Sequence, residues 1–252
     1  MNTLHTAMIN SGQPFGNVEK SWSQREELGP GVWVYRDILK PELNLIDRLE
    51  EVLSQSNGAY EWQEARVGYR EKITEYRDCV DFKIKKLDYP NKNSYEIKLD
   101  SIWQDVYDAQ VNAVVDYCNY FGIKMDYWEA MNFIKYGPGQ HFQEHADHGF
   151  SYVATVSLVA YINDDYEEGG LNFGRLGIDI KPRAGDLYIF PSTFLFSHRA
   201  MPVKSGTKYS VVTMLDYNDN AHTPQFHAGR NGEYGTGKNS SNNRVAQEIG
   251  QV

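Results

Sequence analysis

The sequence predicts a mainly β protein with flanking helices, and three features support this fold class. Residues 127–217 consist of short runs rich in β-branched and aromatic side chains. Turn-forming residues separate these runs, as at Gly137-Pro138-Gly139 and Asn163-Asp164-Asp165. Two helical patterns precede them along the chain. Many short strands separated by turns are typical of a β-sandwich or barrel.

The first part of the chain is predicted to be irregular and then extended. Residues 1–30 are polar and carry Gly or Pro at several positions, which favours an irregular lead-in. The run GVWVYRDIL, residues 31–39, has the apolar and aromatic content of a strand. Residues 60–100 mix aromatic and charged side chains, and we expect short strands and loops there.

Two amphipathic helices are predicted before the β-rich part. Pro41 suits the first turn of a helix that continues to Gly58. In the second helix, apolar residues recur at helical spacing from Ser101, a suitable N-cap, to Gly122. The apolar stripe of the first helix consists of Leu45, Leu49, Val52 and Leu53.

These patterns predict one domain over residues 31–218. Residues 31–126 would supply helical support, and residues 127–218 would form the β-core. The run SYVATVSLVAYI is apolar on both faces, so we expect the early helices to cover one side of its sheet. Residues 219–252 contain little apolar material and predict a polar C-terminal tail or flap.

Composition excludes several classes of partner. The net charge of −9 and the lack of a basic cluster beyond short runs such as Lys83-Ile84-Lys85-Lys86 argue against nucleic acid. No apolar run reaches the length of about 18 residues needed to span a membrane, and no secretory signal begins the chain, so a cytoplasmic protein is expected. Cys79 and Cys118 lack the spacing of a thiolate metal site.

Three residues form a candidate metal site. His145 and Asp147 are two positions apart, so in a strand both side chains point to the same face. His198 follows the strand DLYIFPS, and the turn after that strand can bring it back toward the pair. Two His and one carboxylate leave coordination positions open, as in non-haem Fe(II) oxygenases, whereas structural zinc favours four ligands with Cys.

The remaining histidines are weaker candidates. In an extended strand His141 would face the same way as His145 but lie about 13 Å away, too far to share an ion. His148 would face the opposite side of that strand. We expect solvated side chains at His5, His222 and His227.

Two further residues suggest an anionic cosubstrate. Lys208 follows His198 by ten positions and begins the strand KYSVVTML. An ammonium group buried in an apolar barrel is costly unless an anion compensates it, and a carboxylate ligand would do so. Tyr136 precedes His145 by nine positions and offers a phenol to the same carboxylate.

Four runs carry a family resemblance: KYGPGQHFQEHADHGF, YINDDYEEGGLNFG, IKPRAGDLYIFPS and SHRAMPVKSGTKYSVVTMLDY. Together they resemble the catalytic domain of prolyl 4-hydroxylase-like 2-oxoglutarate/Fe(II)-dependent dioxygenases. The resemblance implies a double-stranded β-helix, the cupin-like jelly roll. It implies that His145, Asp147 and His198 hold the iron, and that Tyr136 and Lys208 bind the C5 carboxylate of 2-oxoglutarate.

The resemblance also implies a reaction. Fe(II) would be the cofactor, with 2-oxoglutarate and O2 as cosubstrates and ascorbate as a candidate reductant. 2-Oxoglutarate would be decarboxylated oxidatively to succinate and CO2 while a prolyl residue of a peptide or protein is hydroxylated. The acidic turn Asp164–Glu168 could attract a basic partner or form a solvated surface.

Three alternatives share parts of this pattern. The nearest is an oxygenase of the same fold that acts on a free amino acid or another small metabolite. A nucleobase demethylase shares the iron chemistry, but the acidic composition and the absence of a basic groove argue against it. The third alternative belongs to a different functional class: a cupin-like barrel that has the same fold and binds a ligand but catalyses no reaction.

Overall fold

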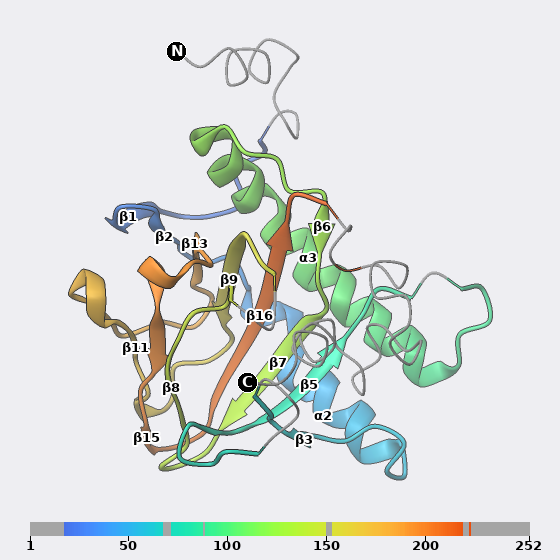
Figure 1. Cartoon of the computed structure of the whole chain (residues 1–252). Coiled ribbons are helices and arrows are strands. Elements are labelled where there is room, and N and C mark those ends of the chain that lie inside the picture. Colours follow the sequence, from blue (N-terminus) through green and yellow to red (C-terminus); the bar gives the residue numbers. More distant parts are fainter. Residues whose placement is uncertain (1–17, 68–71, 88, 150–152, 219–221, 223–252) are drawn as a thin grey trace, which may run out of the picture.

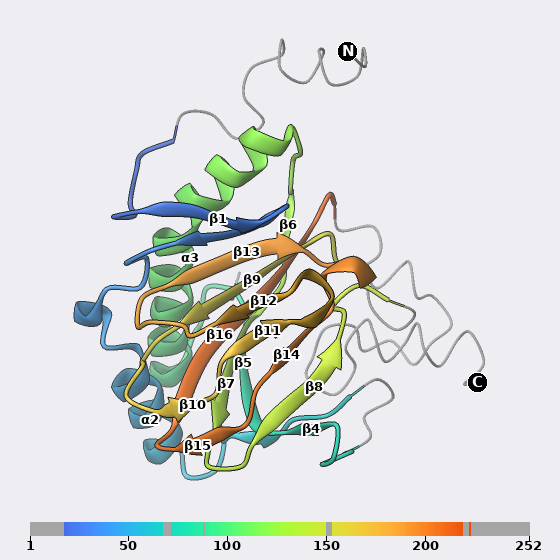
Figure 2. The ribbon, with the colours of Figure 1, turned by 90° about the vertical axis from the view of Figure 1, so that its left-hand side faces the viewer.

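The computed structural model describes residues 18–67, 72–87, 89–149, 153–218 and 222. These residues form three layers (Figures 1 and 2). Two helices cover one face of a nine-stranded sheet, and a five-stranded sheet lies against its other face. Two facing sheets of this kind form the double-stranded β-helix that was predicted.

The nine-stranded sheet is the larger wall of the barrel. Its order is β1-β2-β13-β9-β16-β7-β5-β3, with β6 paired to the end of β16. All neighbours in it are antiparallel. Its strands are β1 (Arg25–Gly29), β2 (Val32–Tyr35), β3 (Gln63–Glu64), β5 (Val80–Ile84), β6 (Tyr127–Trp128), β7 (Met131–Tyr136), β9 (Val156–Tyr161), β13 (Leu187–Pro191) and β16 (Lys208–Asp216).

The five-stranded sheet is the smaller wall, with the order β12-β11-β14-β8-β4. Its strands are β4 (Arg77–Asp78), β8 (His141–His145), β11 (Leu171–Phe173), β12 (Ile178–Ile180) and β14 (His198–Ala200). A separate pair joins β10 (Glu167–Glu168) to β15 (Val203–Ser205). Short 3-10 turns occur at η2 (Gly174–Leu176) and η3 (Phe194–Phe196).

The first predicted helix is shorter than expected. A 3-10 turn, η1 (Pro41–Leu43), precedes α2 (Leu45–Gln55). Between them Asn44 has φ 47°, a left-handed conformation that interrupts the helix. The predicted apolar stripe is buried, so α2 packs as the pattern indicated.

The second helix, α3 (Ser94–Phe121), begins before the predicted start. Its N-cap is Asn93, whose side chain accepts hydrogen bonds from the backbone of Tyr95 and Glu96. Glu96 in turn accepts from the Asn93 backbone, which completes a capping box. The prediction of Ser101 as N-cap was therefore wrong, whereas Gly122, at φ 65°, ends the helix as expected.

The predicted irregular lead-in contains one strand. β1 falls within residues 1–30 and pairs with β2 through the turn at Pro30 and Gly31. Its sequence, REELG, lacks an alternating apolar pattern because it is an exposed edge strand held by backbone hydrogen bonds. The strand predicted over residues 31–39 is confirmed at β2.

Helix α3 packs the helical layer against the larger sheet. Comparing substitutions on its buried and exposed faces tests that packing. Ile102 is fully buried in the core, whereas Ile97 is 57% exposed on the same helix. Ile102→Ala is expected to lower the free energy of unfolding by about 2–5 kcal/mol because it leaves a cavity. Ile97→Ala should change it by less than about 0.5 kcal/mol in the same urea titration. Equal effects would contradict this packing.

No helix in the described ranges is long and apolar enough to cross a membrane. Cys79 and Cys118 are both buried and free in the described structure.

Candidate active site

The candidate site is a cavity of about 260 Å³ between the two sheets. Its walls include all five residues predicted to bind the metal and the cosubstrate. Strands far apart in sequence supply them, so the barrel fold itself assembles the site. Below, this space is called the barrel cavity.

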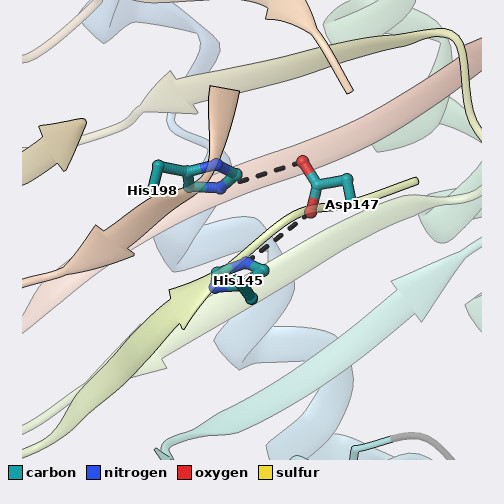
Figure 3. A group of neighbouring side chains, drawn as sticks. All are labelled: His145, Asp147 and His198. Carbon is teal, nitrogen blue, oxygen red and sulfur yellow. Dashed lines mark ion pairs between the residues drawn. The ribbon is translucent and has the colours of Figure 1, made fainter. Parts of the chain in front are cut away.

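The three candidate metal ligands lie together at one side of the barrel cavity (Figure 3). His145 ends β8 and pairs directly with His198, which begins β14, and Asp147 follows β8 by two residues. Their potential ligand atoms all lie within 4.8 Å of one another. The Asp147 carboxylate oxygens lie 3.6 Å from His145 Nε2 and 3.8 Å from His198 Nε2.

A β-bulge in β8 sets which side chains share the face of His145. Between the pairs His198↔His145 and Ala200↔Phe142, β8 advances three residues while β14 advances two. Phe142 therefore faces the same way as His145, and their rings stack with centroids 3.6 Å apart. The expectation that His141 shares this face was wrong, because it assumed an unbroken strand. His141 instead contacts two backbone carbonyls outside the cavity wall.

Both imidazoles present a nitrogen to the centre of the site. His145 Nδ1 lies 2.8 Å from the carbonyl of Gln143, and His198 Nδ1 lies 3.1 Å from that of Phe196. Because a carbonyl can only accept, Nδ1 carries the proton and Nε2 keeps its lone pair. Burial, together with nearby His198, lowers the pKa of His145 to about 3, so this ring is neutral at pH 7. Two imidazole nitrogens and a carboxylate turned toward one centre fit a divalent metal ion.

Two buried hydroxyl groups hold the carboxylate of this set. Ser157 on β9 donates to Asp147 Oδ2 at 2.6 Å. Ser192, directly after β13, lies 2.8 Å from the Ser157 hydroxyl and can donate to it in turn. These contacts fix the rotation of the carboxylate.

Lys208 lies at the other end of the barrel cavity and is 1% exposed. Its Nζ donates to the carbonyl of Gly169 at 2.8 Å and lies 4.2 Å from the centroid of the Tyr136 ring. No carboxylate in the described part of the chain forms an ion pair with it, and burial lowers the pKa of Lys208 to about 7. An ammonium group in this setting favours an anionic ligand.

The turn at Gly169 explains how its carbonyl reaches Lys208. Gly169 has φ 64°, and a Cβ there would lie 3.0 Å from Val203 and 3.1 Å from Tyr166. A Cβ on Gly170 would lie 2.6 Å from the carbonyl oxygen of Ile180. Only glycine fits both positions, so the Gly-Gly pair is required for the backbone beside Lys208.

Tyr136 pairs directly with Lys208 across β7 and β16. Burial raises the pKa of Tyr136 well above its ordinary value, so the phenol keeps its proton. The ammonium group lies over the ring face, and the predicted bond from the phenol to a cosubstrate carboxylate stays a prediction.

The structure also tests the predictions for two of the remaining histidines. His148 Nδ1 lies 2.6 Å from the carbonyl of Ala154, and His148 does not line the cavity. His222, predicted to be solvated, is only 2% exposed. It stacks on Tyr127 and contacts Asp216 at 3.0 Å, so tertiary contacts overrode its polar sequence surroundings. His5 and His227 lie outside the described residues.

Comparison with known proteins identifies this architecture. Residues 131–215 match the family described as the 2OG-Fe(II) oxygenase superfamily, where 2OG is 2-oxoglutarate. Over residues 131–215, called the oxygenase core from here on, the chain is similar to that superfamily. The matched residues include Lys208 and the three candidate ligands His145, Asp147 and His198, called the metal triad below, and the superfamily takes its name from the predicted metal and cosubstrate.

Individual relatives agree with the oxygenase core. The chain is 30% identical over 88 residues to procollagen-lysine,2-oxoglutarate 5-dioxygenase 2 of Homo sapiens, covering 34% of this chain and 12% of that protein. It is 27% identical over 114 residues to a prolyl 4-hydroxylase-like protein of Acanthamoeba polyphaga mimivirus, covering 36% of this chain and 46% of that one. The chain therefore spans less than half the length of these relatives.

A solved structure shows the same fold. The prolyl hydroxylase of Trichoplax adhaerens, in complex with a hypoxia inducible factor peptide fragment, aligns with a TM-score of 0.59 and 13% identity. The alignment covers 74% of this chain and 84% of that one. It confirms the predicted jelly-roll fold of the oxygenase core.

The hydroxyl contacts to Asp147 give a prediction about metal affinity. Ser157→Ala is expected to weaken Mn²⁺ binding by about 10- to 100-fold because the carboxylate loses its fixed rotation. Ser192→Ala should weaken it less, since Ser192 acts only through Ser157. Isothermal titration of the metal-free protein measures both.

A matched control separates this effect from general loss of packing. Thr213 on β16 is also a buried hydroxyl residue, but its hydroxyl contacts the sulfur of Met131 rather than the site. Thr213→Val should keep wild-type Mn²⁺ affinity. Wild-type affinity in Ser157→Ala would show that the hydroxyl does not position Asp147.

Proposed function

We propose that the chain is a 2-oxoglutarate- and Fe(II)-dependent hydroxylase of prolyl residues in a peptide or protein. The observation that carries this proposal is the pairing of two features in one cavity. A two-His, one-carboxylate cluster lies at one side, and a buried lysine without an anionic partner in the described chain lies at the other. Together they suit one metal ion and one dicarboxylic cosubstrate.

In this proposal each residue has a defined task. His145, Asp147 and His198 would hold Fe(II), which supplies oxidative decarboxylation of 2-oxoglutarate with O2 and hydroxylation of a C–H bond. Lys208 would bind the distal carboxylate, and Tyr136 would donate to it from the neighbouring strand. The apolar side chains between them exclude water from the cosubstrate.

The peptide substrate is supported by relatives. The structural neighbour from Trichoplax adhaerens holds a peptide fragment, and the viral relative resembles prolyl 4-hydroxylases. Lys83 of β5, which is exposed, is among the residues that line the barrel cavity. A lysyl residue is the second candidate, favoured by the 30% identity to the human procollagen-lysine dioxygenase.

Substrate-stimulated turnover tests this function. Fe(II)-loaded protein is incubated with 2-oxoglutarate, O2 and ascorbate, and with matched peptides that contain proline, lysine or neither. We expect succinate formation to rise with the proline peptides, and mass spectrometry to find one added oxygen on proline. Oxygen on lysine instead would favour the second candidate. No stimulation by any peptide, with turnover of a free amino acid, would overturn the peptide assignment.

A further inference from the structure

The floor of the barrel cavity is organised in rows that cross three strands of the larger sheet. Lys208 on β16 pairs with Tyr136 on β7 and forms the row at the cosubstrate end. A second row begins at Val212, four residues after Lys208 on β16. Val212 pairs with Asn132 on β7, and Asn132 pairs with Lys83 on β5. At about 3.4 Å per residue, this second row lies about 14 Å from the first.

The metal triad lies toward the same end of the cavity as Lys83. Ser157, which contacts Asp147, pairs with Met214, two residues beyond Val212 on β16. β9 and β5 lie on opposite sides of β16 and β7, at a separation of three strand spacings, or about 14 Å. The floor between the metal triad and Lys83 therefore has the length of several extended residues, which suits a peptide better than a small acid.

Positive charge predominates in the wall around this floor. Arg66, Arg77 and Lys83 line the cavity in addition to Lys208. Two carboxylates line the cavity, Asp147 and Glu129. Glu129 lies near Lys85, where its charge opposes the lowering of the Lys85 pKa by burial. Because the whole chain carries −9, this local excess of cations does not follow from its composition.

Arg77 and Lys83 differ in how firmly their charges are balanced. Arg77 pairs with Asp81 at 3.1 Å and lies 4.8 Å from the ring of Phe142, so it braces the wall beside the metal triad. Lys83 is exposed, and the described residues include no carboxylate in ion-pair contact with it. Its charge is therefore available to a ligand.

Asn132, beside Lys83, offers a complementary group. Its Nδ2 lies 3.5 Å from Asp81 Oδ2, which orients the amide. Its Oδ1 is buried and has no hydrogen-bond partner within the described chain. A buried carbonyl oxygen without a donor is costly, and a peptide N–H would satisfy it.

We propose that Lys83 and Asn132 form a subsite for an acidic residue of the peptide substrate. Lys83 binds the carboxylate of that residue, and Asn132 Oδ1 accepts a backbone N–H beside it. Arg66 adds positive potential at the same opening. The acidic turn Asp164–Glu168 takes no part, because it lies next to Gly169 and does not line the cavity. This inference rests on the proposed function, since it names the substrate class of the same site.

Direct binding of charged peptides tests the subsite. Three fluorescent peptides of equal length carry one proline flanked by Glu, Gln or Lys. The full chain is loaded with Mn²⁺ and 2-oxoglutarate, and binding is followed by anisotropy without O2. We expect the Glu peptide to bind about ten-fold tighter than the Lys peptide, because Lys83 would attract the Glu side chain and repel the Lys side chain. This preference should shrink as salt is raised.

Variants tie the preference to the proposed residues. Lys83→Gln should remove most of the preference for Glu, and Lys83→Glu should reverse it. Asn132→Leu should weaken all three peptides by a similar factor, because it removes the acceptor and not a charge. Lys181→Gln is the matched control, since Lys181 is exposed but does not line the cavity, and it should bind like wild type.

The failure of this inference is distinguishable from failure of the proposed function. The absorption band formed by Fe(II) and 2-oxoglutarate reports the metal and cosubstrate sites without any peptide. If that band forms but the Glu and Lys peptides bind equally, or no peptide binds, the subsite is wrong while the oxygenase chemistry stands. A preference for Glu that Lys83→Glu leaves unchanged would also overturn it.

Discussion

Replacing His198 by alanine is expected to abolish turnover and to weaken divalent metal binding by more than about 100-fold. This loss of metal affinity is larger than that expected for a residue that only positions a metal ligand, because one of the three direct ligands is removed. The His198 side chain is 5% exposed, so neighbouring side chains have little room to move in and replace it as a ligand. Isothermal titration with Mn²⁺ measures the affinity, and succinate formation measures the turnover.

His141→Ala is the matched control for this experiment. His141 lies on the same strand as His145, but the bulge in β8 turns it away from the barrel cavity. The variant should keep wild-type metal affinity and turnover. Loss of metal binding in His141→Ala, or its retention in His198→Ala, would contradict the assignment of ligands.

Lys208→Met is expected to raise the dissociation constant for 2-oxoglutarate by about 30-fold or more and to leave Mn²⁺ affinity unchanged. Methionine keeps much of the buried volume over the Tyr136 ring but removes the charge. Loss of one member of a buried charge pair costs about 2–5 kcal/mol, which sets the scale of the effect. Titration of the metal-loaded protein with 2-oxoglutarate measures it, and wild-type affinity would show that the cosubstrate binds elsewhere.

The buried lysine also predicts how cosubstrate affinity depends on pH. In the free protein, burial lowers the pKa of Lys208 to about 7, and a bound carboxylate would raise it again. Below pH 7 the ammonium form is already present. Above pH 7 binding must take up a proton, so affinity should fall by up to about ten-fold per pH unit. In Lys208→Arg this dependence should disappear, because a guanidinium keeps its charge.

The clustering of His145, Asp147 and His198 could be predicted because part of its geometry is local. His145 and Asp147 are separated by two positions, and the alternation of side chains along an extended chain places them on one face. His198 needed only a turn after a recognisable strand. His141 was misplaced because a bulge is not visible in the sequence, and one extra residue reverses the face of every side chain before it.

Contacts between distant strands were not predictable in this way. Ser157 and Ser192 approach Asp147 only because β9 and β13 are neighbours in the larger sheet. Arg77 reaches the cavity because β4 pairs with β8. The start of α3 did have a local signal, the Asn93 to Glu96 capping box, but residues 94–100 lie in a stretch of mixed aromatic and charged side chains that was predicted to form strands and loops. Strand β1 had no such signal, since it is held by backbone pairing with β2 and by contacts to distant residues such as the ion pair between Arg25 and Asp116.

The most direct test of the central claim is an anaerobic titration of Fe(II)-loaded protein with 2-oxoglutarate. The visible metal-to-ligand charge-transfer band requires the metal and the cosubstrate in one site. We expect this band in wild type and in His141→Ala, and its loss or sharp weakening in His145→Ala and Asp147→Ala. No band in folded, iron-loaded wild type would contradict the cosubstrate assignment and favour a cupin-like binding barrel.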